Sequence, residues 1–208
     1  MAPDQRTQFR RAYFGPIDLY LAWHDGFTAD TAGLAALPAA GQAEAAHELL
    51  AVLRRDQADA RAIIGLGFLR CEEALPLLHD YLRRGTYALY ALQAIAAISP
   101  AGLYQPLVAQ SLQPTRPWTQ LIDVLVGLRE LPGLLPAAEV VAALLALLTH
   151  REFLVRHHAL ATLRQLLHLP TPAFPAPDPI ATLLASRWWP CRHRQARRRL
   201  LTQLAGAR

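Results

Sequence analysis

Residues 49–98, LLAVLRRDQADARAIIGLGFLRCEEALPLLHDYLRRGTYALYALQAIAAI, contain the same apolar pattern twice. Leu53-Arg-Arg is followed by Leu66-Gly-Phe-Leu, and Leu82-Arg-Arg is followed at the same spacing by Ile95-Ala-Ala-Ile. The same shift along the sequence aligns Leu53 with Leu82 and Leu66 with Ile95, so the apolar residues of the first copy have apolar counterparts in the second. Self-similarity at a fixed period of about 30 residues is typical of a protein built from stacked structural units.

The pattern continues through the second half of the chain. The interval between copies becomes longer toward the C-terminus, and the added residues fall in stretches rich in proline. The later copies place Leu112 with Leu125 and Leu128, Leu147 with Leu160 and Leu163, and Leu184 with Leu200 and Leu204.

Within each copy the apolar residues recur every three or four positions, which predicts two amphipathic helices. Short polar turns at 54–59, 83–86, 113–117 and 149–152 would join them as antiparallel pairs. The composition agrees, because 38 Ala and 39 Leu against 7 Val and 7 Ile favour helix over sheet. We therefore expect an all-α fold, an α-solenoid of about five antiparallel helix pairs.

The repeats divide the chain into four segments of one continuous domain, 1–208. Residues 1–42 would form an N-terminal cap or degenerate repeat of two or three helices, with 17–23 and 31–37 as the clearest. The repeats occupy 43–169, and the proline-rich segment 170–179 would be an extended spacer. Residues 180–208 would form a basic C-terminal repeat or cap.

Two stretches resemble HEAT repeats. Val155-Arg-His-His-Ala-Leu-Ala-Thr-Leu163 is similar to the second-helix signature of that family, in which an apolar residue and Arg precede an alanine-rich helix. Residues 66–78, LGFLRCEEALPLL, resemble the short bacterial variety first described in phycobilisome lyases. Ala60-Arg61 and Cys191-Arg192 echo the Val-Arg pair, whereas Tyr90 and Gln120 replace its arginine. The resemblance implies a solenoid, and shared repeats alone do not imply lyase activity.

The charge is strongly asymmetric along the chain. Residues 1–152 hold 12 Arg and 15 acids, a net charge of −3, whereas residues 153–208 hold 9 Arg and one acid, a net charge of +8. All 21 basic residues are Arg, and Lys and Asn are absent, as expected for a GC-rich bacterial coding sequence. Only two cysteines, no secretory signal and no long apolar run predict a soluble, cytoplasmic protein without a membrane partner.

No sequence motif indicates catalysis or a bound cofactor. Phosphate-binding loops, nucleophile elbows and zinc-protease motifs are absent, and the Gly65-Leu-Gly67 pair is expected to let helices pack closely. His157 and His158 are adjacent and diverge by about 100° on a helix, which does not suit a metal site. We therefore expect no enzyme activity, no metal and no cofactor.

Two groups of residues are candidates for binding a partner. Aromatic residues, including Phe153, stand at or just before the starts of successive second helices, where they would either fill gaps between layers or form a stripe of rigid anchors. The segment 187–199, RWWPCRHRQARRR, would place arginines on a final helix that begins at Pro190 and is anchored by Leu200, Leu201 and Leu204. The candidate partner-binding residues are Tyr87, Tyr90, Trp118, Arg156, Arg187, Trp188, Arg194, Arg197 and Arg198.

These features favour a non-enzymatic module for protein-protein interaction. An adaptor, an assembly factor or an immunity protein would bind through the concave face and the basic end, and the partner would present an acidic patch. The alternative is a nucleic-acid-binding protein, either a simple binder or one like the DNA glycosylases built from HEAT-like repeats, for which Trp118 and Asp123 would be the candidate groove residues. The 9 Arg and 11 acids of residues 43–152 give a net charge of −2, which favours the protein partner.

Overall fold

The computed structural model describes residues 1–99, 105–131, 134, 136–170, 172, 176–186 and 190–206. Within these ranges the chain forms 13 α-helices, one short 3-10 turn and no β-strand. The prediction of an all-helical fold is therefore confirmed. None of the helices in these ranges combines the length and the apolar character needed to cross a membrane. The chain forms two compact units, 1–103 and 104–208.

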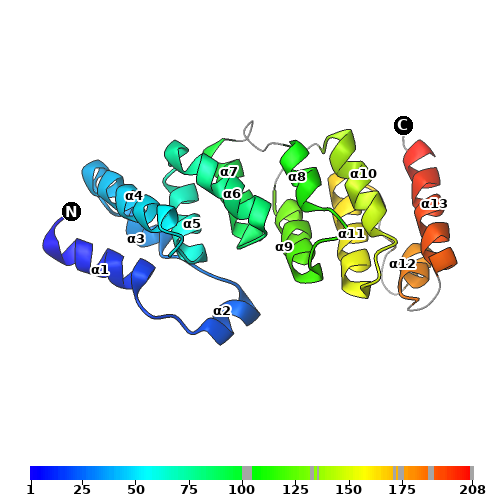
Figure 1. The fold of residues 1–208 in the computed structure, drawn as a ribbon, viewed down its shortest axis with the longest axis horizontal. Coiled ribbons are helices and arrows are strands. Elements are labelled where there is room, and N and C mark those ends of the chain that lie inside the picture. The colour runs from blue at the N-terminus through cyan, green and yellow to red at the C-terminus, as the bar shows by residue number, and fades with distance from the viewer. Residues whose placement is uncertain are drawn as a thin grey trace. The chain divides into compact units, whose positions relative to one another are not determined.

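The first unit contains two helix pairs preceded by three N-terminal helices. Helix α4 packs against α5, α6 packs against α7, and the second helices α5 and α7 pack against each other (Figure 1). The turns between paired helices lie where the sequence predicts them. The elements are α1 (Pro3–Phe14), α2 (Leu19–Asp25), α3 (Thr31–Ala35), α4 (Ala39–Arg54), α5 (Ala60–Phe68), the 3-10 turn η1 (Glu72–Ala74), α6 (Leu75–Arg84) and α7 (Ala88–Ile98).

Local sequence explains where these helices begin and end. The Asp59 carboxylate accepts a hydrogen bond from the Arg61 backbone N–H at 2.9 Å and so caps the start of α5. Gly85 follows α6 with a φ of +75°, and its N–H donates to the carbonyls of Tyr81 and Leu82. This left-handed backbone favours glycine, which allows the sharp reversal into α7.

Two glycines allow α5 to approach its neighbours closely. A Cβ placed on Gly67 would lie 2.8 Å from the Cα of Ala94 in α7. A Cβ placed on Gly65 would lie 2.7 Å from the Tyr13 ring of α1. Because a real Cβ does not approach other carbon atoms this closely, the glycines permit the packing that the sequence predicts for them.

The N-terminal helices are attached to the first pair through a buried arginine. The Arg61 guanidinium in α5 pairs with Asp59 at 2.6 Å. It also donates to the carbonyl oxygens of Ala12 at 3.0 Å and Gly15 at 2.9 Å, which lie at the end of α1. The helices expected at 17–23 and 31–37 correspond to α2 and α3, and α1 precedes them.

The second unit contains three helix pairs. Each first helix packs against its second helix, α8 packs against α10, and α9 packs against α11 (Figure 1). The two compact units are consistent with stacked helix pairs, whereas the continuous five-pair domain stays a prediction. The helices are α8 (Gln105–Ser111), α9 (Trp118–Arg129), α10 (Ala138–Leu147), α11 (Phe153–Leu166), α12 (Pro179–Leu184) and α13 (Pro190–Gly206).

Hydrogen bonds fix the register between the second helices of this unit. The Thr162 hydroxyl of α11 donates to the carbonyl of Leu125 in α9 at 3.0 Å, although Thr162 has no exposed surface. One turn further along, the Gln165 amide donates to the carbonyl of Arg129. The two contacts advance together along both helices, so α9 and α11 run parallel and their first turns lie beside each other.

The repeat anchors are buried in all four second helices in which they were predicted. Leu66, Ile95 and Leu125 have no exposed surface, and Leu160 is 3% exposed. The last helix begins at Pro190 as expected, and Leu200 is buried.

The expected anchoring of the last helix needs one correction. Leu201 is 41% exposed, and Leu204 is only half-buried. The buried face of α13 carries His193, Ala196 and Leu200, so Leu201 lies about 100° around the helix from that face.

Candidate functional site

Tyr87 and Tyr90, the predicted anchors in the first unit, contact the N-terminal segment of their own chain. The Phe27 ring lies edge-on to both, with centroid distances of 5.4 Å to Tyr87 and 5.8 Å to Tyr90. The Phe27 backbone N–H donates to the Tyr90 hydroxyl oxygen at 2.6 Å. Both tyrosines are half-buried. These contacts support the gap-filling interpretation of the two tyrosines rather than the anchoring one.

Trp118 is exposed, in contrast, and belongs to a cluster in the second unit. It begins α9 and is 42% exposed, and Phe153 and Leu154, which begin α11, are 45% and 46% exposed. Because α9 and α11 are parallel and in register, the three side chains stand at the same end of neighbouring helices. We call Trp118, Phe153 and Leu154 the apolar edge.

Leu154 is the member of the apolar edge that belongs neither to the candidate residues nor to the aromatic group named from the sequence. The sequence places it between two residues with assigned roles, Phe153 in the aromatic set and Val155 in the buried HEAT-like signature. Val155 has no exposed surface, and the helix turns by about 100° per residue, so Leu154 lies outside the buried face. This helical offset from Val155 is the signal that identifies it.

Arg156 needs a correction, because its assignment as a partner-binding residue conflicts with its burial. The side chain has no exposed surface. Its Nε donates to the carbonyl of Leu184 at 2.8 Å and one Nη to that of Ser186 at 3.2 Å, both at the end of α12. The other Nη donates to the carbonyls of His150 and Arg151 before α11, at 2.6 and 2.7 Å. Arg156 therefore joins α11 to α12 and leaves no surface for a partner.

The final helix presents a set of solvent-facing arginines. Only His193, Ala196 and Leu200 of its described side chains are buried, and the His193 Nε2 lies 2.7 Å from the carbonyl oxygen of Ser186. The arginines occupy the remaining sides of α13, as expected for residues 192–199. Arg187 and Trp188 lie outside the described residues. We call the exposed set, Arg192, Arg194, Arg197, Arg198 and Arg199, the arginine face.

The basic C-terminal region contains one internal ion pair. Arg164 in α11 forms two hydrogen bonds with the carboxylate of Asp178, which also accepts from the backbone N–H groups of Ile180 and Ala181. The hydrogen bond with Arg164 is the main cause that lowers the pKa of Asp178. With Arg156 and Arg164 both buried, the solvent-facing arginines of this region that the structure describes are those of the arginine face.

Asp123, the acidic candidate of the nucleic-acid alternative, lies on α9, five residues after Trp118. The residue reaches the surface, yet desolvation by the protein around its carboxyl group raises the pKa of Asp123 to about 6. A raised carboxyl pKa means that the folded state disfavours the charged form. The ionised carboxylate is therefore a small cost of folding at neutral pH.

The substitution Asp123→Asn should raise the free energy of unfolding at pH 8 by about 1 kcal/mol. The effect is this small because Asp123 is exposed, and solvent screens much of the cost of its charge. The pKa of Asp123 is 3.8 in the unfolded chain and about 6 in the folded protein. The gain in stability should therefore be complete above pH 6 and shrink as the pH falls toward 4. Urea denaturation at several pH values would measure it. Glu139→Gln, an exposed control on α10, should show no such gain, and an equal gain at pH 4 and pH 8 would contradict the assignment.

Two adjacent histidines of this unit, His157 and His158, contact neighbouring side chains. An Nη of Arg129 lies 3.1 Å from the Nδ1 of His158. Burial is the main cause that lowers the pKa of His158, and the positive charge of Arg129 lowers it further. The His157 ring lies 5.8 Å from the Phe153 ring. Among the described residues, no group of three or more His, Cys, Asp or Glu side chains is placed to hold a metal ion.

No protein-family model, no curated protein and no solved structure matches this chain.

Proposed function

We propose that this chain is a non-enzymatic protein-interaction module built as a HEAT-like α-solenoid, of the adaptor, assembly-factor or immunity-protein kind. It binds another protein through the apolar edge and through the arginine face. The observation that carries the proposal is the cluster of three large apolar side chains, each more than two-fifths exposed, at one end of two parallel helices.

The apolar edge suits a protein partner for physical reasons. Tryptophan and phenylalanine bury a large area with few rotamers to freeze, which is why such residues dominate the binding energy of many interfaces. Hydrogen bonds from Thr162 and Gln165, near the C-terminal end of α11, hold α11 in register with α9. The cluster therefore stands on a rigid base, and little conformational entropy is lost on binding.

The arginine face sets the charge of the partner. Arg194, Arg197 and Arg198 are exposed on one helix and face solvent in different directions. Such a concentration of positive charge accelerates encounter with an acidic surface and orients it. Duplex DNA is the alternative acidic partner, but the exposed residues of α9 are Trp118, Thr119 and Asp123, which form no basic track. A protein with an acidic patch fits this mixture of apolar and basic surface better.

The test begins with affinity capture from the source organism and continues with the purified partner. The triple variant Trp118→Ser, Phe153→Ser, Leu154→Ser should weaken binding about 100-fold, as expected for loss of the central anchors. The matched control Tyr20→Ser, Leu21→Ser removes two exposed residues of the first unit, 68% and 52% exposed, and should leave the affinity unchanged. Equal affinities for the triple variant and the wild type would refute the apolar edge.

A second variant tests the arginine face. Arg194→Gln, Arg197→Gln, Arg198→Gln should keep the thermal stability, because these side chains are exposed, and should slow association with the partner and reduce its salt dependence. If the wild type instead binds duplex DNA tightly at about 0.15 M salt, and this variant loses that binding, the nucleic-acid function replaces the one proposed.

A further inference from the structure

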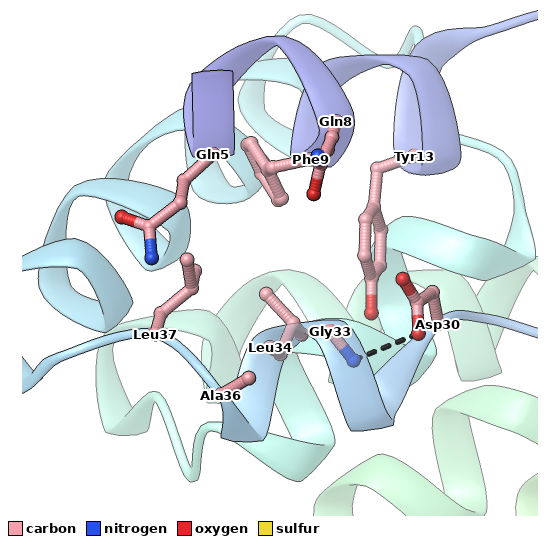
Figure 2. A pocket seen from close by; sticks show the side chains of 9 residues that line it. All are labelled: Gln5, Gln8, Phe9, Tyr13, Asp30, Gly33, Leu34, Ala36 and Leu37. Atoms are coloured by element: carbon pink, nitrogen blue, oxygen red, sulfur yellow. Dashed lines mark hydrogen bonds between the residues drawn. The ribbon is translucent and has the colours of Figure 1, made fainter. Parts of the chain in front are cut away.

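A small pocket lies in the first unit, between α1 and α3, separate from the surfaces described above. Its volume is about 120 Å³. Figure 2 shows an apolar part formed by Phe9 of α1 with Leu34 and Leu37, and a polar end where the Tyr13 hydroxyl points toward Asp30. Phe9, Leu34 and Leu37 are almost fully buried, so the apolar part is preformed.

The Tyr13 hydroxyl is the unusual feature of this pocket. The Tyr13 side chain is 2% exposed, and its oxygen has no hydrogen-bond partner among the described residues. Most buried polar atoms in proteins are hydrogen-bonded, and one left without a partner is costly. The ring cannot easily turn away, because it packs closely against Gly65 of α5. The hydroxyl is thus held in a position where it lacks a partner.

Asp30 supplies the charge of the polar end. One carboxylate oxygen, Oδ1, accepts from the Gly33 backbone N–H at 2.8 Å and caps α3. None of the described cationic side chains forms an ion pair with Asp30. Burial and this carboxylate together raise the pKa of Tyr13, so the phenol stays neutral and keeps a lone pair that can accept a hydrogen bond.

We propose that this pocket binds a small primary alkylammonium ion. The ammonium N–H groups donate to the Asp30 carboxylate and to the Tyr13 oxygen, and the alkyl chain packs against Phe9, Leu34 and Leu37. An ammonium ion fits because it brings several donors and a positive charge to two acceptors. The volume suits about five non-hydrogen atoms, since a cavity of about 150 Å³ accommodates benzene.

The test is a titration of the full chain with n-butylammonium chloride, followed by isothermal calorimetry and by the aromatic NMR resonances. We expect saturable binding in the millimolar range, consistent with the small size of the ligand. The neutral isostere n-butanol should bind at least about tenfold more weakly, because it lacks the charge. Equal binding of butanol and butylammonium would overturn the proposal and leave only an apolar cavity.

Two single substitutions locate the site. Asp30→Asn should weaken butylammonium binding at least about tenfold while the chain stays folded, because asparagine caps helices as well as aspartate. The matched control is Asp18→Asn, since Asp18 caps α2 through the backbone N–H groups of Tyr20 and Leu21 but does not line this pocket. Equal losses in both variants, or no loss in Asp30→Asn, would overturn the proposal.

Tyr13→Phe provides an independent measurement. The variant keeps the ring against Gly65 and removes only the hydroxyl, so its melting temperature without ligand should equal or exceed that of the wild type. Its affinity for butylammonium should fall about three- to tenfold, because one acceptor is lost. An unchanged affinity would show that the hydroxyl takes no part in binding and would overturn its role in the proposal.

Discussion

Replacing Arg156 by methionine should lower the free energy of unfolding by about 3 to 5 kcal/mol. Methionine preserves much of the aliphatic stem, but it removes the guanidinium that donates to four carbonyl oxygens. Those oxygens lie at the end of α12 and in the turn before α11, and several would be left buried without a donor. Urea denaturation followed by circular dichroism would measure the loss.

The comparison with Arg151 separates burial from charge. Arg151 is the neighbouring arginine in the turn before α11, and its side chain is 85% exposed, so Arg151→Met should change the stability by less than about 0.5 kcal/mol. Arg156→Lys should lie between wild type and Arg156→Met, because lysine keeps the charge but lacks the planar fork of donors. A loss below about 1 kcal/mol for Arg156→Met would refute the role of Arg156 in joining α11 to α12.

The helices and their pairing are predictable because the information is local. Apolar residues at intervals of three and four mark each buried face, and short polar segments mark the turns. Pro190 begins the last helix as expected, since proline is well suited to the first turn. Gly85 likewise stands at the reversal between α6 and α7. The N-terminal helices follow the same rules but lack a repeat that would fix their packing.

The roles of individual polar residues depend on distant contacts that the sequence pattern does not contain. Arg156 occupies the arginine position of a HEAT-like signature, yet its carbonyl partners at Leu184 and Ser186 come from another helix pair. Tyr90 receives its hydrogen bond from Phe27, far earlier in the chain. The residue type alone does not show whether a side chain binds a partner at the surface or holds segments of its own chain together.

The apolar edge and the small pocket differ in how far the sequence alone predicts them. Trp118 is a sequence candidate, and Leu154 follows from the burial of Val155 next to it. Tyr13 and Asp30 carry no motif, and they come together only because α1 and α3 both contact α5. Leu201 is exposed because His193, Ala196 and Leu200 form the buried face of α13, and the sequence pattern alone does not decide which of the adjacent Leu200 and Leu201 faces the core.

Replacing Leu125 by alanine should lower the free energy of unfolding by about 2 to 5 kcal/mol. Leu125 has no exposed surface, and it stands in α9 at the position equivalent to Leu66, Ile95 and Leu160 in their own helices. Its backbone carbonyl accepts the hydrogen bond from the Thr162 hydroxyl. The substitution keeps that hydrogen bond and removes only packed side-chain volume, so the loss reports the cost of the cavity.

Leu201→Ala is the matched control, since it removes the same atoms from a side chain that is 41% exposed, and it should cost less than about 0.5 kcal/mol. Both variants would be measured by urea denaturation under the same conditions, with the slope of the unfolding transition as a check that the unfolded states are comparable. If Leu125→Ala cost no more than Leu201→Ala, Leu125 would not be a core residue. The repeat register that places an equivalent apolar residue in successive second helices would then be wrong.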